Sequence, residues 1–264
     1  MEKRLCEAMT EERYKSIGVE LRHAEVTRKP VPPLAERFHL SVESAYAVQR
    51  IWAKEQLKAG RKLAGYKVGL TSKAAQQHFG VFEPDFGHLF EDMKIESPMQ
   101  TADLIQPKIE GEIAFRLGRD LEGPGVTFEQ AALAIDGASA AIEVIDSRIE
   151  NWKIAAADTI ADNGSSARFA LAKNWTKVSV AELPFLGMAF SVNGEVVLSG
   201  AGAAVMENPI HAAVFLANAL GKLGVGLKAG QVILSGAPSG MVSLQAGNKY
   251  ACEILNLGLA EVEA

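Results

Sequence analysis

The chain has 264 residues, 48% of them hydrophobic, which is enough for a substantial core in one large domain. Its formal net charge of -5 comes from 27 basic and 32 acidic residues that are interspersed, which argues against a nucleic-acid partner. No apolar run is long enough to span a bilayer and the charged N-terminus lacks a signal-peptide core, so we expect a cytoplasmic protein without a membrane partner.

Two cysteines, Cys6 and Cys252, lie far apart in the sequence and form no pair with metal-ligand spacing. This usage suits a reducing compartment better than a disulfide framework. We expect both cysteines to be structural.

Residues 2 to 60 are predicted to be helical. Apolar side chains recur at helical spacing in Ala45, Val48, Ile51 and Trp52, and Ser41 is a plausible helix start. A proline-rich joint, Lys29-Pro-Val-Pro-Pro, interrupts the pattern. We therefore expect two helices in this part of the chain.

After Gly60 the sequence changes to short apolar runs separated by glycine, proline and aspartate, which indicates strands. The predicted strands are Ala64 to Leu70, Ile109 to Leu117, Ala141 to Ile145 and Met188 to Leu198. Asn193-Gly194 within the last run predicts a tight hairpin turn, because both residues tolerate positive φ.

A helical period returns from Pro209 to Leu223, and Val232 to Leu234 begins a strand-rich tail. Strands and helices do not alternate regularly, so the pattern predicts an α+β body, residues 61–264, with a helical N-terminal extension, residues 1–60.

Two carboxylates, Glu110 and Glu112, stand two residues apart in the apolar segment Ile109 to Phe115. On a strand they face the same way, and burying both would be costly unless a cation such as Mg²⁺ or Mn²⁺ lies between them. A solvated strand face is the alternative for this pair alone.

A third carboxylate, Glu143, lies between apolar residues on both sides, and buried unpaired glutamates are rare. Three carboxylates on two apolar strands would form an oxygen site for a hard divalent cation, with positions left for water and a chelating substrate. From composition alone, the metal site and a solvated surface remain open alternatives.

Other polar residues lie in unusual settings. Lys67 interrupts an apolar run between glycines, where it could neutralise carboxylates or extend from a strand edge to solvent. Asp85 lies in the turn sequence Glu83-Pro-Asp-Phe-Gly. The turn could hold the Asp85 side chain rigidly for a role in the site, or Asp85 could simply cap the turn. The segment from Asp158 to Ser166 is interpreted as a polar loop with donors for a bound carboxylate.

Five ordered motifs together resemble the 2-hydroxypenta-2,4-dienoate (2-oxopent-4-enoate) hydratases and their sister 4-oxalocrotonate decarboxylases, within the fumarylacetoacetate hydrolase superfamily. They are Gly65 to Lys73, Glu83 to Gly87, Ile105 to Phe115, Glu143 to Arg148, and Asp158 to Asn163. The resemblance covers the chain from about Ala45 to its C-terminus.

The resemblance implies a mixed β-sandwich roll and a homo-oligomer. It also implies a Mg²⁺ or Mn²⁺ site formed by Glu110, Glu112 and Glu143, with active-site roles for Lys67 and Asp85 as catalytic residues. We expect Ser165, Asn163 and Leu70 to bind a small 2-oxo or 2-hydroxy acid. On this hypothesis the substrate's 1-carboxylate and 2-oxygen chelate the metal, and Lys67 and Asp85 transfer protons or orient water.

Within that resemblance, Asp85 in Glu83-Pro-Asp-Phe-Gly, Trp152 in Asn151-Trp-Lys-Ile, and Asp158-Thr159 look like the hydratase pattern rather than the decarboxylase pattern. The expected reaction is addition of water to 2-hydroxypenta-2,4-dienoate in the meta-cleavage catabolism of aromatic compounds, giving a 4-hydroxy-2-oxo acid. A 4-oxalocrotonate decarboxylase and a non-catalytic assembly partner of such an enzyme are the alternatives, and a complex with a sister enzyme is a further expectation. The sequence departs from the family pattern at three places: Asn208-Pro209, Gly164, and Gly137 to Ala141. These departures put the substrate size and the reaction rate in doubt more than metal binding.

Overall fold

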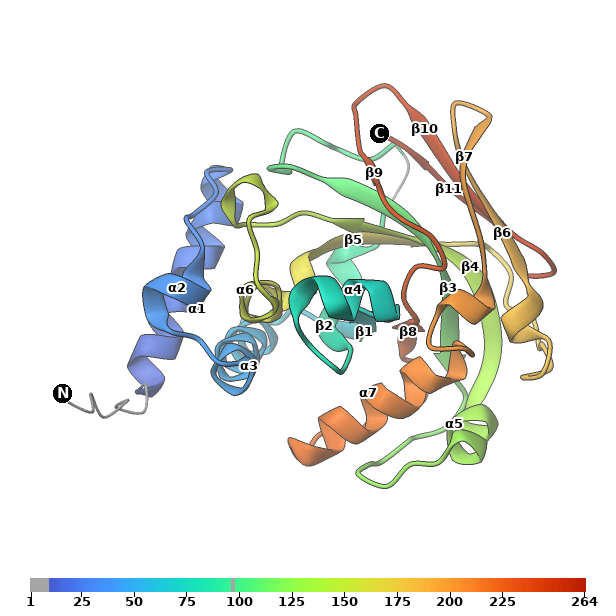
Figure 1. Cartoon of the computed structure of the whole chain (residues 1–264), viewed down its shortest axis with the longest axis horizontal. Helices are drawn as coiled ribbons and strands as arrows, with labels where there is room; N and C mark the ends of the chain where they lie inside the picture. Colours follow the sequence, from blue (N-terminus) through green and yellow to red (C-terminus); the bar gives the residue numbers. More distant parts are fainter. Residues whose placement is uncertain (1–9, 96–97) are drawn as a thin grey trace.

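The computed structural model describes residues 10–95 and 98–264, whose strands form two sheets (Figure 1). The larger sheet runs in the order β2 (Asp85–Phe90), β1 (Leu63–Gly69), β8 (Val232–Leu234), β3 (Lys108–Leu117), β4 (Ile135–Ile145) and β5 (Ser166–Leu171), and β9 (Val242–Ser243) pairs with β3. The smaller sheet runs β11 (Gly258–Glu263), β10 (Lys249–Ile254), β6 (Gly187–Val192) and β7 (Glu195–Ala201). Since β1 and β8 are parallel while the other pairs are antiparallel, the curled larger sheet is mixed, and the α+β prediction is confirmed.

Most predicted strands are confirmed, two of them to within one residue. The hairpin between β6 and β7 turns at Asn193 and Gly194, which have φ of 52° and 87° as a tight primed turn requires. Strand β4 starts six residues earlier than predicted. Its residues Gly137 to Ala140 are small and lack the β-branched signal, but they fit where β4 is buried.

The two sheets approach each other closely at Gly111. A Cβ atom there would lie 2.6 Å from Cys252 Sγ and 2.9 Å from Met188 Sδ. Gly111 therefore faces β10 and β6, and alternation along β3 turns its neighbours Glu110 and Glu112 to the opposite face. Cys252 is buried at this contact, as expected of a structural cysteine, whereas Cys6 lies outside the described residues.

Residues 10–60, the part of the N-terminal region that the structure describes, form three helices rather than the two predicted: α1 (Glu11–Thr27), α2 (Leu34–Phe38) and α3 (Val42–Lys58). The Ser41 cap is confirmed, since its side chain accepts from the Ser44 N–H. The extra helix α2 begins after Pro33, where the Asp158 carboxylate accepts from the N–H groups of Leu34 and Ala35 at 2.7 and 2.8 Å. A cap supplied by a residue over a hundred positions away leaves no local sequence signal.

The remaining α-helices are α4 (Lys73–Phe79), α5 (Phe128–Ala134), α6 (Ala156–Ala161) and α7 (Ile210–Lys222). Helix α7 confirms the helix predicted at Pro209 to Leu223. Helix α6 shows that the polar-loop interpretation of Asp158 to Ser166 was wrong in its first part, because Asp158 also accepts from the Ala155 N–H and so caps α6. None of the helices in the described ranges is both long and apolar enough to cross a membrane.

The N-terminal helices are bonded directly to the body. The buried Gln49 on α3 donates to the carbonyls of Phe86 and Ile160, each at 2.8 Å. Val31 forms a parallel bridge with Ile149. The division into residues 1–60 and 61–264 stays a prediction. The Gln49 bond to Phe86 links the helical segment to β2, the strand that begins with Asp85.

Candidate active site and metal centre

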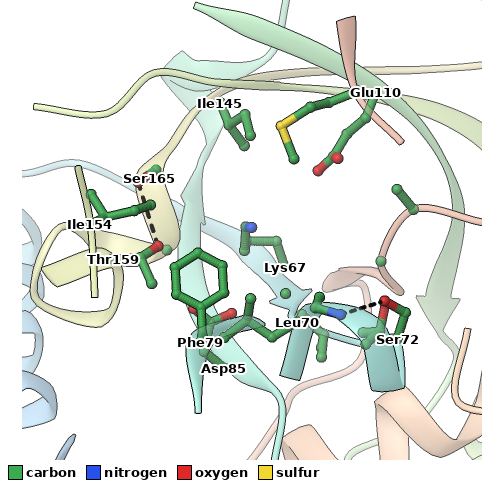
Figure 2. A pocket seen from close by; sticks show the side chains of 18 of the residues that line it. Lys67, Leu70, Ser72, Phe79, Asp85, Glu110, Ile145, Ile154, Thr159 and Ser165 are labelled. Atoms are coloured by element: carbon green, nitrogen blue, oxygen red, sulfur yellow. Dashed lines mark hydrogen bonds between the residues drawn. The ribbon is translucent and has the colours of Figure 1, made fainter. Parts of the chain in front are cut away.

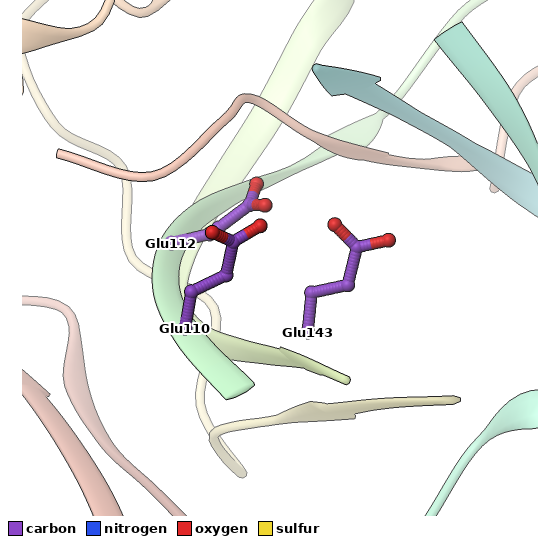
Figure 3. Close-up of side chains that lie close together, drawn as sticks. All are labelled: Glu110, Glu112 and Glu143. Atoms are coloured by element: carbon purple, nitrogen blue, oxygen red, sulfur yellow. The ribbon is translucent and has the colours of Figure 1, made fainter. Parts of the chain in front are cut away.

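The three glutamates predicted to bind metal lie side by side on two neighbouring strands (Figure 3). Glu110 and Glu112 come from β3, and Glu143 on β4 is the direct cross-strand partner of Glu110. One carboxylate oxygen from each residue lies within 4.8 Å of the others. All three are buried, with Glu143 wholly inaccessible to solvent.

The hydrogen bonds available to these carboxylates are few. Glu112 accepts from the Gly236 N–H at 2.6 Å. Within the described residues, neither carboxylate oxygen of Glu143 has a hydrogen-bond partner, although the Lys67 ammonium lies 3.3 Å from one of them. A set of three oxygen donors with unused lone pairs and one nearby ammonium fits a hard divalent cation such as Mg²⁺ or Mn²⁺.

Electrostatics point the same way. Burial, together with the Glu143 carboxylate, raises the pKa of Glu110 to about 7 and the pKa of Glu112 well above its usual value. Burial disfavours the ammonium of Lys67, but Glu143 and Asp85 outweigh it and raise the pKa of Lys67. Burial and repulsion between neighbouring carboxylates therefore disfavour negative charge on Glu110 and Glu112, and a bound divalent cation would relieve that cost.

Lys67 and Asp85 are brought together by the pairing of β1 with β2. Gly69 on β1 is the strand partner of Asp85, and a Cβ atom on Gly69 would lie 2.3 Å from Asp85 Oδ1 and 3.3 Å from Lys67 Nζ. Only a glycine leaves room for these two groups. Asp85 is buried at the first residue of β2 rather than within the turn, and burial raises its pKa while Lys67 opposes that change.

These groups border a cavity of about 180 Å³ (Figure 2). Five of the eight predicted site residues line it: Lys67, Leu70, Asp85, Glu110 and Ser165. Hydroxyls of Thr71, Ser72, Thr159 and Ser239 add polar surface, while Phe79, Ile145, Trp152, Ile154 and Met241 add apolar surface. The cavity thus combines one carboxylate of the cluster, Glu110, with an apolar region, as a site for a small organic acid would. Glu112 and Glu143 are not among its lining residues.

A larger cavity of about 780 Å³ shares Leu70 and Asp85 with this one and lies between α3, α6 and α7. None of the three glutamates lines it, nor does Lys67. The smaller cavity is therefore the candidate active site.

Asn163, predicted to bind substrate, uses its side chain to hold β2. Its amide oxygen accepts from the His88 N–H at 2.7 Å, and its amide nitrogen donates to the His88 carbonyl at 3.0 Å. Asn163 is not among the residues that line the smaller cavity, whereas Gly164 and Ser165 are. The substrate-binding role of Asn163 stays a prediction. Its hydrogen bonds join the turn at residues 163–165 to β2.

His88, which Asn163 holds through these hydrogen bonds, should make the free energy of unfolding depend on pH. Its ring lies against Tyr66 and Phe90, and burial lowers its pKa to about 4, with the Asn163 hydrogen bond opposing the change. The unfolded chain takes up a proton on His88 below pH 6.5, while the folded chain does so only near pH 4. The free energy of unfolding should therefore fall by about 3 kcal/mol as the pH drops through that window. Urea titrations of the wild type, His88→Gln and the exposed-histidine control His23→Gln check this, and an unchanged pH dependence in His88→Gln would contradict it.

Sequence reasoning missed several residues that shape the site. Gly236 donates to Glu112 through its backbone, and its φ of 102° with the Thr71 side chain against it favours glycine. A glycine two residues after a short apolar strand was the available signal. The sequence singled out Trp152 but predicted no contact for it. In the structure its indole N–H donates to the Gln106 carbonyl at 2.9 Å, which fixes the ring in the cavity wall.

Comparison with known proteins places this geometry among related enzymes. Residues 82–263 match the family model described as fumarylacetoacetate (FAA) hydrolase C-terminal. The chain is 39% identical over 258 residues to a 2-keto-4-pentenoate hydratase of Paraburkholderia xenovorans, covering 97% of this chain and 96% of that protein. It is 38% identical over 251 residues to a 2-hydroxyhexa-2,4-dienoate hydratase of Comamonas testosteroni, covering 93% and 95%.

Among solved structures, the chain is similar to the 4-oxalocrotonate decarboxylase from Pseudomonas putida G7 complexed with magnesium and adipate. The TM-score is 0.93 at 32% sequence identity, and the match covers 97% of this chain and 98% of that one. A second structure of that decarboxylase holds calcium and acetate, with a TM-score of 0.91. The likeness extends through the N-terminal helices, which the matched region of the family model does not include.

Proposed function

We propose, from the premise that this chain belongs to the fumarylacetoacetate hydrolase family, that it is a divalent-metal-dependent hydratase. Its reaction is the addition of water to 2-hydroxypenta-2,4-dienoate (2-oxopent-4-enoate) or a close homologue, giving a 4-hydroxy-2-oxo acid in the meta-cleavage catabolism of aromatic compounds. Relatives that carry this hydratase name over nearly the whole chain support the proposal.

The observation that carries the chemistry is the buried triad of Glu110, Glu112 and Glu143 beside a cavity that holds Lys67 and Asp85. We propose these glutamates as the ligands of Mg²⁺ or Mn²⁺, which when bound supplies positive charge that polarises a substrate oxygen. The substrate is a small 2-oxo or 2-hydroxy acid with a carboxylate at one end.

Hydration requires a proton to leave water and a proton to reach a carbon atom of the substrate. Asp85 Oδ1 is buried beside Lys67 and has no hydrogen-bond partner among the described residues, so it is available to accept a hydrogen bond from water in the cavity. Lys67 holds a positive charge beside Glu143 and can orient or neutralise a carboxylate. We propose these two as the proton-transfer pair.

Ser165 and Leu70 are the proposed substrate contacts. The Ser165 hydroxyl donates to Asp162 at 3.3 Å and lies 3.5 Å from the Thr159 hydroxyl, and its two lone pairs leave room to accept from a substrate hydroxyl or a water molecule as well. Leu70, at φ 54°, follows β1 and lines the same cavity as Ser165 (Figure 2).

Decarboxylation of 4-oxalocrotonate is the second candidate, favoured by the structural likeness to an enzyme of that name. That decarboxylase was solved with adipate, a dicarboxylate. In this chain Lys67 is the one basic residue among those that line the cavity in the described ranges, and it already faces Glu143. A second substrate carboxylate would meet no cation there, which supports a monoacid and hence the hydratase.

The two candidates are separated by substrate. The purified protein with Mg²⁺ or Mn²⁺ should convert 2-hydroxypenta-2,4-dienoate to 4-hydroxy-2-oxopentanoate, followed by loss of dienoate absorbance and by product identification. It should release at most about one hundredth as much CO₂ from 4-oxalocrotonate, because a buried unpaired charge disfavours the diacid by a few kcal/mol. Release of CO₂ without hydration of the dienoate would overturn the assignment.

We further propose that the chain assembles as a homo-oligomer and that it associates with a sister decarboxylase in the same pathway. Turnover by the isolated protein would exclude the alternative of a non-catalytic assembly partner. Light scattering of the protein alone, and with a sister decarboxylase, tests both assemblies.

A further inference from the structure

The segment between α6 and β5 has an unusual backbone. Asn163, Gly164 and Ser165 have φ of 57°, 63° and 54°, so three consecutive residues occupy the left-handed region. That region is unfavourable for residues other than glycine, and a run of three persists only where surrounding groups hold it. This left-handed turn forms one wall of the smaller cavity through Gly164 and Ser165.

Arg148 holds the turn from the side away from the cavity. Its guanidinium donates to the carbonyl of Asp162, directly before the turn, and to the carbonyl of Ser166, directly after it. It also donates to the Asp146 carbonyl at 2.8 Å, near the end of β4. One buried side chain therefore brackets the turn and ties it to the strand that carries Glu143.

Asp162 extends this bracket to Ser165. One carboxylate oxygen pairs with Arg148 Nε, while the other accepts from the Arg148 N–H at 3.0 Å and from the Ser165 hydroxyl at 3.3 Å. The Ser165 carbonyl in turn accepts from the Asp146 N–H at 2.8 Å. Both the backbone and the side chain of Ser165 are thus bonded to groups that Arg148 positions, and the Thr159 hydroxyl lies 3.5 Å from the Ser165 hydroxyl.

The turn also meets the catalytic lysine. A Cβ atom on Gly164 would lie 3.2 Å from Lys67 Cδ, so the turn packs along the Lys67 side chain. Any shift of the turn would move the surface against which Lys67 extends toward Glu143.

We propose that Arg148 is a positioning residue, which holds the left-handed turn 163–165 in the conformation that aims Ser165 and Lys67 into the cavity. Arg148 does not line the cavity, and it acts through Asp162 and the turn. The effect of Arg148 on kcat/KM rests on the proposed hydratase function, whereas its effect on hydrogen exchange in the turn rests on the geometry of the turn alone.

The test compares Arg148→Lys, which keeps the charge but loses the forked donors, with Asp162→Asn and with a matched control, Arg168→Lys. Arg168 lies on β5, near the turn, and donates to its own neighbour Ala167. Arg148→Lys and Asp162→Asn should lower kcat/KM by roughly tenfold to a hundredfold, as for a small misplacement of catalytic groups. Mn²⁺ affinity should stay within about twofold, because the glutamates lie on β3 and β4. Arg168→Lys should leave both quantities unchanged.

Two further measurements separate positioning from a general structural role. Hydrogen exchange should accelerate in the peptide spanning the turn more than in β3 and β4. The loss caused by Arg148→Lys should shrink in a Ser165→Ala background, because both changes act on one contact.

Wild-type kcat/KM in a folded Arg148→Lys or Asp162→Asn variant would overturn the proposal, as would full additivity with Ser165→Ala. If Arg148→Lys fails to fold, the less disruptive Asp162→Asn decides by the same criteria. A wild-type protein that does not hydrate the dienoate would overturn the proposed function instead, and the exchange of the turn peptide in the variants would then decide the role of Arg148.

Discussion

Replacing Glu110 with alanine or glutamine is expected to abolish metal-dependent turnover while leaving the fold intact. Glu110 supplies one of three oxygens that lie within 4.8 Å of one another, and it is the glutamate of the triad that lines the cavity. Its loss should lower kcat/KM on the order of a thousandfold, as expected when a charge-stabilising group is removed from a buried site. Mn²⁺ affinity, measured by calorimetry, should fall in parallel.

The stability of Glu110→Gln should change in the opposite direction to its activity. In the presence of a chelator, Glu110 and Glu143 face each other across β3 and β4 and repel. Glutamine removes one of these charges, so the urea midpoint of the metal-free variant should equal or exceed that of the wild type. Glu253→Gln, on the exposed face of β10, is the matched control and should behave as wild type in every assay. Full activity of Glu110→Gln in a chelator would refute the metal-dependent mechanism.

The triad was accessible to sequence reasoning because two simple rules apply to it. The period of a strand puts Glu110 and Glu112 on one face, and an apolar setting makes a charged face costly. What the sequence could not give is register. Glu143 reaches the pair only because β4 aligns it opposite Glu110, and that alignment is set by tertiary pairing.

The residues that hold the site together were harder to predict than those that form it. Asp158 caps α2 across 124 positions of sequence, and Arg148 binds carbonyls on both flanks of the left-handed turn. These side chains serve the backbone of distant segments, so neither spacing nor composition marks them. The same cause explains the missed helix α2 and the polar loop that proved to begin as α6.

Glycines carried part of the missing information. Gly69 leaves room for Asp85 beside Lys67, and Gly111 lets β10 approach the face of β3 opposite to that of Glu110 and Glu112. In the sequence both look like breaks in apolar strands. In the structure each marks a place where another group comes within contact distance of the backbone, which is the physical reason for a glycine inside a strand.

Replacing Lys67 with methionine is the second change expected to have a large effect, and it should separate metal binding from catalysis. Lys67 is buried, and its ammonium lies 3.3 Å from Glu143. Removing that charge should lower kcat by at least about a hundredfold, through loss of the proton-transfer pair with Asp85. It should at the same time tighten Mn²⁺ binding, because a cation that competes for the same carboxylate is gone.

Stability supplies the independent check on this role. In a chelator, Lys67→Met leaves the buried carboxylates without their neighbouring ammonium, so the free energy of unfolding should fall by about 3 kcal/mol. Saturating Mn²⁺ should restore more stability to Lys67→Met than it adds to the wild type, because the ion then provides the only compensating charge. Lys249→Met, which removes an exposed strand lysine paired with Glu261, is the matched control. If Lys67→Met bound Mn²⁺ more weakly than the wild type, Lys67 would be supporting the metal site rather than competing with it, and its assignment to proton transfer would have to be given up.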